Sequence, residues 1–175
     1  IGLSERKFYK QSLNALKVTS HENEAIAKKE FKQYSNYYNP IKWQGNLLVL
    51  KTSLGEIPKF VFVNSRGKEK LIVRPGSLLN NTFSVTDSVM VWNEFFPTRY
   101  YNKNYNNIVT YNLNTHKKRT LTKKARTFHS RISPNGKIIV SVEVDENIQW
   151  FLSFRDAKTG AIQKRVAFKN NQLIQ

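Results

Sequence analysis

Residues 1–37 carry hydrophobic positions at the spacing of an α-helix. In the stretch 5–17, three apolar residues fall near one side: Phe8, Leu13 and Leu16. A second stretch begins after Ser20, a good N-cap, and has Glu22 and Glu24 in its first turn, where acids suit the helix dipole. Both stretches are short and weakly amphipathic, so the pattern predicts a short helical connecting segment over residues 1–37.

From Tyr38 onward the hydrophobic pattern changes to a period of two, or to short apolar runs. Each run is rich in β-branched and aromatic residues and is bounded by Gly, Asn, Asp or Pro, as strands are. Several runs are nearly apolar throughout, which predicts strands buried on both faces. The pattern therefore predicts an all-β fold, with strands at 47–50, 59–63, 89–92, 108–111, 138–142 and 150–154.

The predicted strands recur along the chain. Gln44–Val49 aligns with Thr86–Val91 at an offset of 42 (86 minus 44), and the latter aligns with Pro134–Ile139 at an offset of 48 (134 minus 86). A four-stranded unit every ~40–50 residues is typical of β-propeller blades, and a two-sheet sandwich ranks second. We therefore expect a partial propeller with four-stranded antiparallel blades at 38–76, 77–125 and 126–168, and the start of a further strand at 169–175.

Turn sequences in this region point to a known repeat family. Ser133–Ile138 resembles the Ser-Pro-Asp-Gly-Lys turn of TolB-like (WD-type) β-propeller repeats, and Asn107–Thr115 resembles the strand and hairpin that follow in such blades. Lys117–Thr122 is similar to their closing strand, and Asp156–Gly160 repeats the hairpin with the family's Asp and Gly. Asn and Gly suit these hairpins because they tolerate positive φ. The first unit has Asn64–Gly67 instead, and its assignment rests on the period alone.

The resemblance covers about residues 38–168, and three blades cannot close a ring, since propellers have about 4–8 blades. It therefore implies part of a larger propeller, or a part that associates with another copy, because an open array exposes blade faces and edges. The resemblance also implies protein–protein interaction in the bacterial periplasm or cell envelope. The chain shows no charged n-region with a following apolar h-region, so no signal peptide is recognised in it.

Composition adds a strong positive charge. The 175 residues include 29 Lys and Arg against 12 Asp and Glu, a net charge of +17. This charge suggests a polyanionic partner, although a chain rich in Asn, Ile, Tyr and Lys is also what an AT-rich genome encodes. No apolar stretch approaches the ~20 residues of a membrane span. The absence of cysteine excludes disulfides, thiolate metal sites and a cysteine nucleophile.

No motif for catalysis or metal binding is complete. His21-Glu22 begins a His-Glu-x-x-His zinc motif, but Ala25 stands where the second histidine is needed. No Gly-x-Ser-x-Gly elbow is present, and His129-Ser130 lies in a predicted inner strand, where we expect a structural role. We interpret Glu143, Asp145 and Glu146 as a solvated loop rather than a calcium or acid/base site. The sequence therefore predicts no catalytic residue, no metal and no cofactor.

Positive charge is segregated along the chain. No acidic residue occurs between Glu94 and Glu143, and the loop 96–106 within this interval is rich in aromatics. Basic groups interleaved with aromatics bind nucleic acids through phosphates and base stacking, and the same mixture suits an anionic glycan. The alternative is an outer hairpin facing solvent at 117–124, where lysines block edge aggregation. The candidate partner-binding residues are Arg99, Tyr100, Tyr101, Lys103, Tyr105, Lys117, Lys118, Arg119, Lys123 and Lys124.

These observations favour a non-catalytic binding or scaffolding module that acts on a protein, or an anionic glycan, through its loops. A second hypothesis is an accessory propeller domain of a larger envelope enzyme, such as a metallopeptidase whose catalytic residues lie outside this chain. A third is binding of single-stranded nucleic acid, which we favour less. Self-association through open blade edges is a further expectation.

Overall fold

The computed structural model describes residues 34–98 and 104–168, all within one compact unit, Lys32–Gln175. Nearly all of the predicted helical segment lies outside the described residues, and so does the strand expected at 169–175. The prediction placed residues 35–37 in the helical segment, but strand β1 begins at Ser35 and these residues belong to the first sheet. They extend because Tyr37 pairs with Lys51 and Ser35 with Ser53 on the neighbouring strand.

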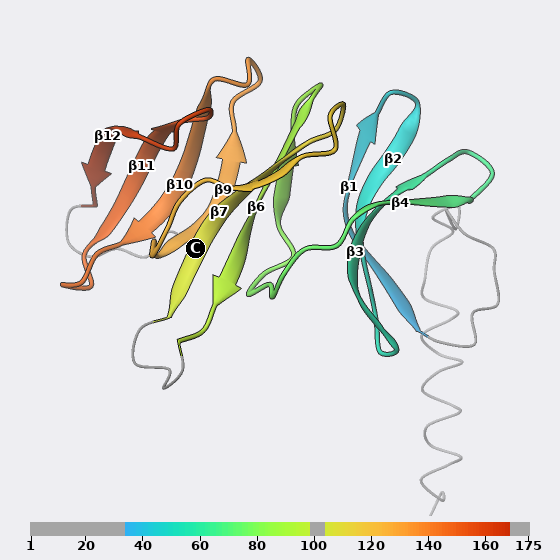
Figure 1. Cartoon of the computed structure of the whole chain (residues 1–175), viewed down its shortest axis with the longest axis horizontal. Helices are drawn as coiled ribbons and strands as arrows, with labels where there is room; N and C mark the ends of the chain where they lie inside the picture. Colours follow the sequence, from blue (N-terminus) through green and yellow to red (C-terminus); the bar gives the residue numbers. More distant parts are fainter. Residues whose placement is uncertain (1–33, 99–103, 169–175) are drawn as a thin grey trace, which may run out of the picture. The chain divides into compact units, whose positions relative to one another are not determined.

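The described strands form three four-stranded antiparallel sheets, each a meander in which every strand pairs with the next (Figure 1). The prediction of an all-β, propeller-type array of four-stranded blades is confirmed. The first sheet holds β1 (Ser35–Trp43), β2 (Asn46–Ser53), β3 (Glu56–Val63) and β4 (Glu69–Val73). The second holds β5 (Phe83–Val85), β6 (Val89–Phe96), β7 (Tyr105–Asn112) and β8 (Lys118–Thr120). The third holds β9 (Thr127–Ile132), β10 (Ile138–Val144), β11 (Trp150–Asp156) and β12 (Ile162–Ala167).

The hairpins between third and fourth strands form as their residue types suggest. Asp156 accepts bonds through Oδ1 from the backbone N–H groups of Lys158 and Thr159, at 3.0 and 2.7 Å. The turn ends at Gly160, whose φ is +79°, a conformation that glycine adopts at little cost. Asn112 caps the corresponding turn in the second sheet in the same way. The side-chain bonds expected at these hairpins are therefore present.

An apolar core joins the first two sheets. Trp92 on β6 lies against Phe60 on β3, with ring centroids 5.1 Å apart, and Phe83 on β5 packs edge-on against the same Phe60. These side chains are fully buried, because each sheet covers the apolar face of the other. The other members of this core are Leu48, Leu50, Met90, Val109, Tyr111 and Leu113.

The second and third sheets pack through a smaller and more polar interface. Its apolar part consists of Val91, Ile108 and Leu121 from the second sheet with Ile132 and Ile139 from the third. Beside this cluster, buried amide, hydroxyl and charged side chains take the place of hydrocarbon. The two interfaces of the array therefore differ in chemistry although the sheets repeat.

The structure corrects the predicted offsets between blades. In β6, Met90 and Trp92 face the preceding sheet, whereas in β10 Ile139 does so. The offset of 48 matches Ile139 to Val91, which lies next to Met90 and Trp92 and therefore faces the other way, because successive side chains of a strand alternate faces. The hairpins that precede β2, β6 and β10 differ in length. A sequence alignment without gaps therefore matches side chains that lie on different faces of their sheets.

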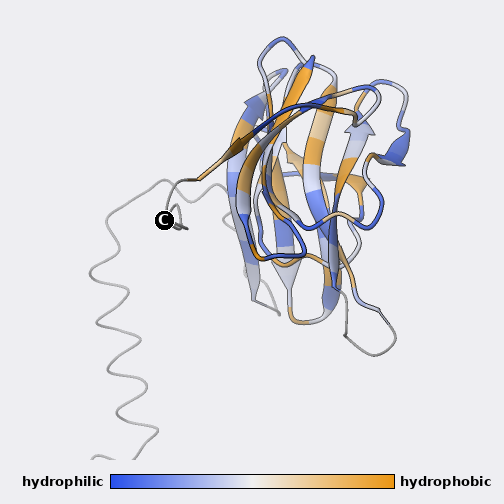
Figure 2. Cartoon of the chain, turned by 90° about the vertical axis from the view of Figure 1, so that its left-hand side faces the viewer, coloured by the Kyte–Doolittle hydropathy of each residue, from blue (hydrophilic) through white to orange (hydrophobic). Residues whose placement is uncertain are grey.

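The two outermost faces of the array are unequal. On the first sheet, Val49, Val61 and Val63 form a buried cluster on the face away from the second sheet. On the third sheet, the face away from the second carries half-exposed apolar residues along β10 and β11, such as Val142 and Leu152. Figure 2 views the molecule from this side and shows hydrophobic segments in the middle strands.

Candidate functional site

The structure divides the predicted partner-binding residues between two ends of the second sheet. Arg99, Tyr100, Tyr101 and Lys103 lie outside the described residues. Tyr105 starts β7, and Lys117 follows the strand's other end, so about seven residues at roughly 3.3 Å each, or some 23 Å, separate them. The described members of the set therefore lie at two ends of one sheet.

Lys123 and Lys124 lie at the Tyr105 end. The next residue, Ala125, accepts a bond from the backbone N–H of Asn106 at 2.8 Å and donates to Asn107 Oδ1 at 3.0 Å. Both lysines are exposed. The chain link between the second and third sheets therefore presents two of the predicted cations beside the start of β7.

Lys118 forms an internal ion pair. Its Nζ lies 2.6 Å from Oε1 of Glu94 and 5.7 Å from the ring centre of Trp92. Glu94 is only 3% exposed and also accepts bonds from Gly76 N at 2.8 Å and from Trp92 Nε1 at 2.9 Å. Lys118 thus neutralises a buried carboxylate between the first two sheets.

Arg119 joins the second sheet to the third. Its Nη1 donates to the carbonyl oxygen of Lys158, in the β11–β12 hairpin, at 2.6 Å. All three cations 117–119 are exposed, but Lys117 belongs to the β7–β8 hairpin, whereas Lys118 and Arg119 lie on β8 and bind Glu94 and Lys158. Neighbouring cations on β8 therefore have different surroundings, which their sequence proximity does not reveal.

An ion pair between the second strand and the fourth strand recurs in all three sheets. Lys51 on β2 pairs with Glu69 on β4 at 2.9 Å, and Glu94 on β6 pairs with Lys118 on β8. Glu143 on β10 pairs with Arg165 on β12 at 2.7 Å. In the second and third sheets the buried partner lies on the face that points to the preceding sheet. In the first sheet it lies on the face that points away from the other two sheets. Sequence reasoning missed these pairs, although a single charge within an apolar strand was the available signal.

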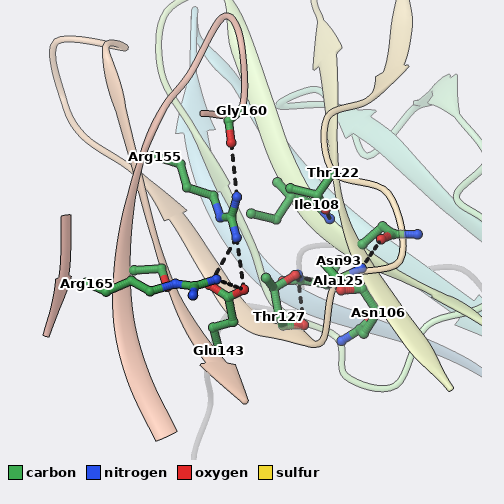
Figure 3. Close-up of polar contacts among 12 residues, drawn as sticks. Asn93, Asn106, Ile108, Thr122, Ala125, Thr127, Glu143, Arg155, Gly160 and Arg165 are labelled. Atoms are coloured by element: carbon green, nitrogen blue, oxygen red, sulfur yellow. Dashed lines mark hydrogen bonds and ion pairs between the residues drawn. The ribbon is translucent and has the colours of Figure 1, made fainter. Parts of the chain in front are cut away.

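Glu143 corrects the prediction of a solvated acidic loop (Figure 3). It lies within β10, is buried, and accepts bonds from Nη2 of Arg155 at 3.0 Å as well as from Arg165. The hydroxyl of Ser153 donates to the same carboxylate, and Arg155 Nη1 donates to Gly160 O at 3.0 Å. Glu143 is buried because two guanidinium groups compensate its charge.

Asn93 and Thr127 form a second group of polar contacts in Figure 3, between the second sheet and the third. Asn93 Nδ2 donates to Thr127 Oγ1 at 3.1 Å, and Thr127 Oγ1 donates to Asn106 O at 2.7 Å. Ser130 N donates to Asn93 Oδ1 at 2.9 Å, so the predicted inner strand β9 is held by side-chain bonds to the second sheet. The side-chain amide of Asn106 is buried and has no partner among the described residues. Side-chain hydrogen bonds therefore join the second sheet to the third at defined positions.

The first sheet holds a third polar cluster. The hydroxyl of Tyr37 and Lys51 Nζ both donate to Glu69 Oε1. Burial alone would raise the pKa of Glu69, but the bonds from Tyr37 and Lys51 outweigh it and lower the pKa below its ordinary value. Burial, and then the bond to Glu69, raises the pKa of Tyr37. The cluster thus holds a charged carboxylate and a neutral phenol.

Neither metal ligation nor a membrane-spanning helix is found in the described part of the chain. Among residues 34–98 and 104–168, no three His, Asp or Glu side chains group so that they could hold a metal ion. Within the same ranges, no helix is long and apolar enough to cross a membrane.

We use the term loop end for the end of the sheets where the β2–β3, β6–β7 and β10–β11 connections lie (Figure 1). The links between sheets run past it: Phe95 N donates to Ser77 O at 2.8 Å, and Arg126 Nη1 donates to Asp145 O at 3.1 Å. The loop end carries Tyr105, Lys123 and Lys124. Besides these connections, the links between successive sheets lie at this end.

No family model and no curated protein match this sequence. Among solved structures, the chain is similar to the β-propeller domain of the Trilobed protease from Pyrococcus furiosus, with 7% identity, a TM-score of 0.59, and coverage of 79% of this chain and 44% of that one. It is similar to Pyrococcus horikoshii acylaminoacyl peptidase, with 9% identity, a TM-score of 0.55, and coverage of 77% and 25%. TolB from Acinetobacter baumannii matches at 14% identity and a TM-score of 0.35, over 73% and 43% of the two chains.

The chain thus spans less than half the length of each of these proteins. At such low identity the likeness concerns the fold, and it agrees with the three four-stranded meanders and with the turn sequences. The chain therefore has the fold of a partial β-propeller.

Proposed function

We propose that the chain is a non-catalytic binding or scaffolding module whose third sheet receives a sheet of a protein partner. The observation that carries this proposal is the apolar face of the third sheet, on the side away from the second. It presents half-exposed apolar side chains from β10 and β11: Val140, Val142, Leu152 and Phe154.

The corresponding faces of the other two sheets show what such a face contacts. Leu48 and Phe60 of the first sheet are buried by the second sheet, and Val91 and Ile108 of the second sheet are buried against the third. In both cases the occupant is another four-stranded sheet. Apolar side chains that stay partly exposed on such a face favour association with a protein surface of the same kind.

The chain has no cysteine, so single cysteines can report the exposure of this face. Leu152→Cys should react with a maleimide in the isolated chain and be protected in the cells that produce it. Leu71→Cys, at an exposed position of β4, is the matched control and should react in both settings. Equal reactivity of Leu152→Cys in both settings contradicts the proposal.

A second candidate is an accessory propeller domain of a larger peptidase in the cell envelope. It is supported by the likeness to propellers of a protease and a peptidase, of which this chain spans 44% and 25%. An antibody against this chain should then precipitate, from the envelope fraction, a larger polypeptide that cleaves peptides, while the isolated chain does not. A precipitated polypeptide without peptidase activity contradicts this candidate.

A further inference from the structure

The most exposed apolar side chains of the described residues gather at the loop end. Leu54, in the β2–β3 hairpin, is 96% exposed, and Ile57 follows it in the same hairpin. Ile148, in the β10–β11 loop, is 67% exposed, and Phe96 is exposed where β6 enters the β6–β7 loop. Each of the three sheets thus presents an apolar side chain to water at this end, from the end of β6 in the second sheet and from a connection in the other two.

Ile148 is also held in a strained conformation. Its φ is 62°, in the left-handed region that β-branched residues rarely adopt. Asp145 fixes the loop, since its Oδ1 accepts from Asn147 N at 2.9 Å and from Gln149 N at 2.8 Å. An exposed β-branched residue gains nothing for folding at such a position, so its presence points to a role outside the fold.

Exposed cations lie beside the tip that carries Ile148. Lys123, Lys124 and Arg126 lie in the link beside the β10–β11 loop, and all three are exposed. Acids lie there as well: Glu56 pairs with Lys59, and Asp145 binds the backbone of its own loop, next to Glu146. The loop end therefore combines projecting apolar groups with positive charge.

We propose that the loop end docks on an anionic lipid surface. The tips come from separate connections, and packed sheets stand about 10 Å apart, so the apolar groups are spaced rather than contiguous. A fluid interface accepts spaced apolar groups without a complementary shape, and anionic headgroups attract lysines near the surface. The proposal concerns a different surface from the open face of the third sheet and does not rest on the proposed function.

The experiment is cosedimentation of the whole chain with vesicles of phosphatidylcholine containing about 30% phosphatidylglycerol, at about 100 mM salt. The chain should bind these vesicles and bind pure phosphatidylcholine much more weakly. Leu54→Asp with Ile148→Asp, and separately Lys123→Glu with Lys124→Glu, should each lower binding by about tenfold or more.

Matched controls change the same charges away from the loop end. Lys117→Glu with Lys137→Glu, at the opposite hairpins, and Leu71→Asp with Ile162→Asp should keep binding within about twofold. Circular dichroism of each variant confirms that it is folded. Absence of binding by the unmodified chain overturns the proposal, and so does an equal loss of binding in the control variants.

A second measurement locates the contact. An environment-sensitive dye on Leu54→Cys should shift to shorter wavelength when vesicles are added, whereas the dye on Asn135→Cys, in the β9–β10 hairpin, should not. Binding without a shift at position 54 overturns the proposal, because another surface then makes the contact.

Discussion

Lys118 Nζ lies 2.6 Å from Oε1 of Glu94, across the edge of the second sheet and over the ring of Trp92. Lys117, one residue earlier, is an exposed hairpin residue. Both were predicted to contact a partner because they belong to one basic run. In the structure, Lys118 neutralises the buried carboxylate of Glu94, and Lys117 does not contact it.

Lys118→Met should therefore destabilise the protein by about 2 kcal/mol, because it leaves Glu94 buried without its counter-ion. Lys117→Met should change the free energy of unfolding by less than about 0.5 kcal/mol. Urea denaturation of the two variants measures the difference. Adding Glu94→Gln to Lys118→Met should recover part of the lost stability, and equal effects of the two lysine substitutions would contradict this reading of the ion pair.

The lowered pKa of Glu69 makes stability depend on pH in the acid range. A carboxyl whose folded pKa lies below its unfolded value of about 4.5 adds stability above that pH, and the contribution is lost as pH falls through the folded pKa. Unfolding of the unmodified chain and of Glu69→Gln should thus differ most near neutral pH and converge below pH 4.5. If the difference in free energy of unfolding stays constant down to about pH 3, the ionisation of Glu69 does not contribute to stability.

Two glycines with the same backbone conformation allow a steric comparison. Gly45 and Gly160 have φ of +78° and +79°, but a Cβ on Gly45 meets nothing within 4 Å, whereas one on Gly160 would lie 2.7 Å from Leu121 O. Gly45→Ala should cost about 1 kcal/mol through strain alone, and Gly160→Ala clearly more, about 2–3 kcal/mol. Thermal unfolding measures both, and equal costs would mean that the β11–β12 hairpin does not pack on the second sheet.

The polar interface between the second and third sheets should be sensitive to loss of one hydroxyl. Thr127→Val preserves the shape but removes the bond to Asn106 O and leaves Asn93 Nδ2 with a poorer acceptor, at a cost of about 1–2 kcal/mol. Thr120→Val, at an exposed position of β8, is the control and should change stability by less than about 0.5 kcal/mol. Denaturant unfolding compares the two.

Relief of strain at the loop end gives a prediction of opposite sign. Ile148→Asn should stabilise the protein by about 1 kcal/mol, because Asn tolerates the left-handed conformation at this position. Val144→Asn, in the adjacent strand, should destabilise it, since Val144 is buried. A loss of stability in Ile148→Asn would mean that the isoleucine side chain contributes packing to the fold.

The elements and their repetition can be predicted from the amino-acid sequence, because period-two patterns and turn residues act locally. Asp156 and Gly160 specify their hairpin through bonds within five residues, and the apolar run at 138–142 specifies a strand. Because these local patterns recur in each four-stranded unit, the repeat and the propeller type of fold can be predicted from them.

The face that each strand turns to its neighbour, and the charges that pair with one another, depend on how the strands and sheets pack. A shift of one residue reverses a strand's faces, and hairpins of different length introduced such shifts between the sheets. Glu143 was assigned to a solvated loop because its partners, Arg155 and Arg165, are distant in sequence and meet it only across paired strands. Ion pairs and exposed tips depend on strand register and sheet packing, and neither is a local property of the chain.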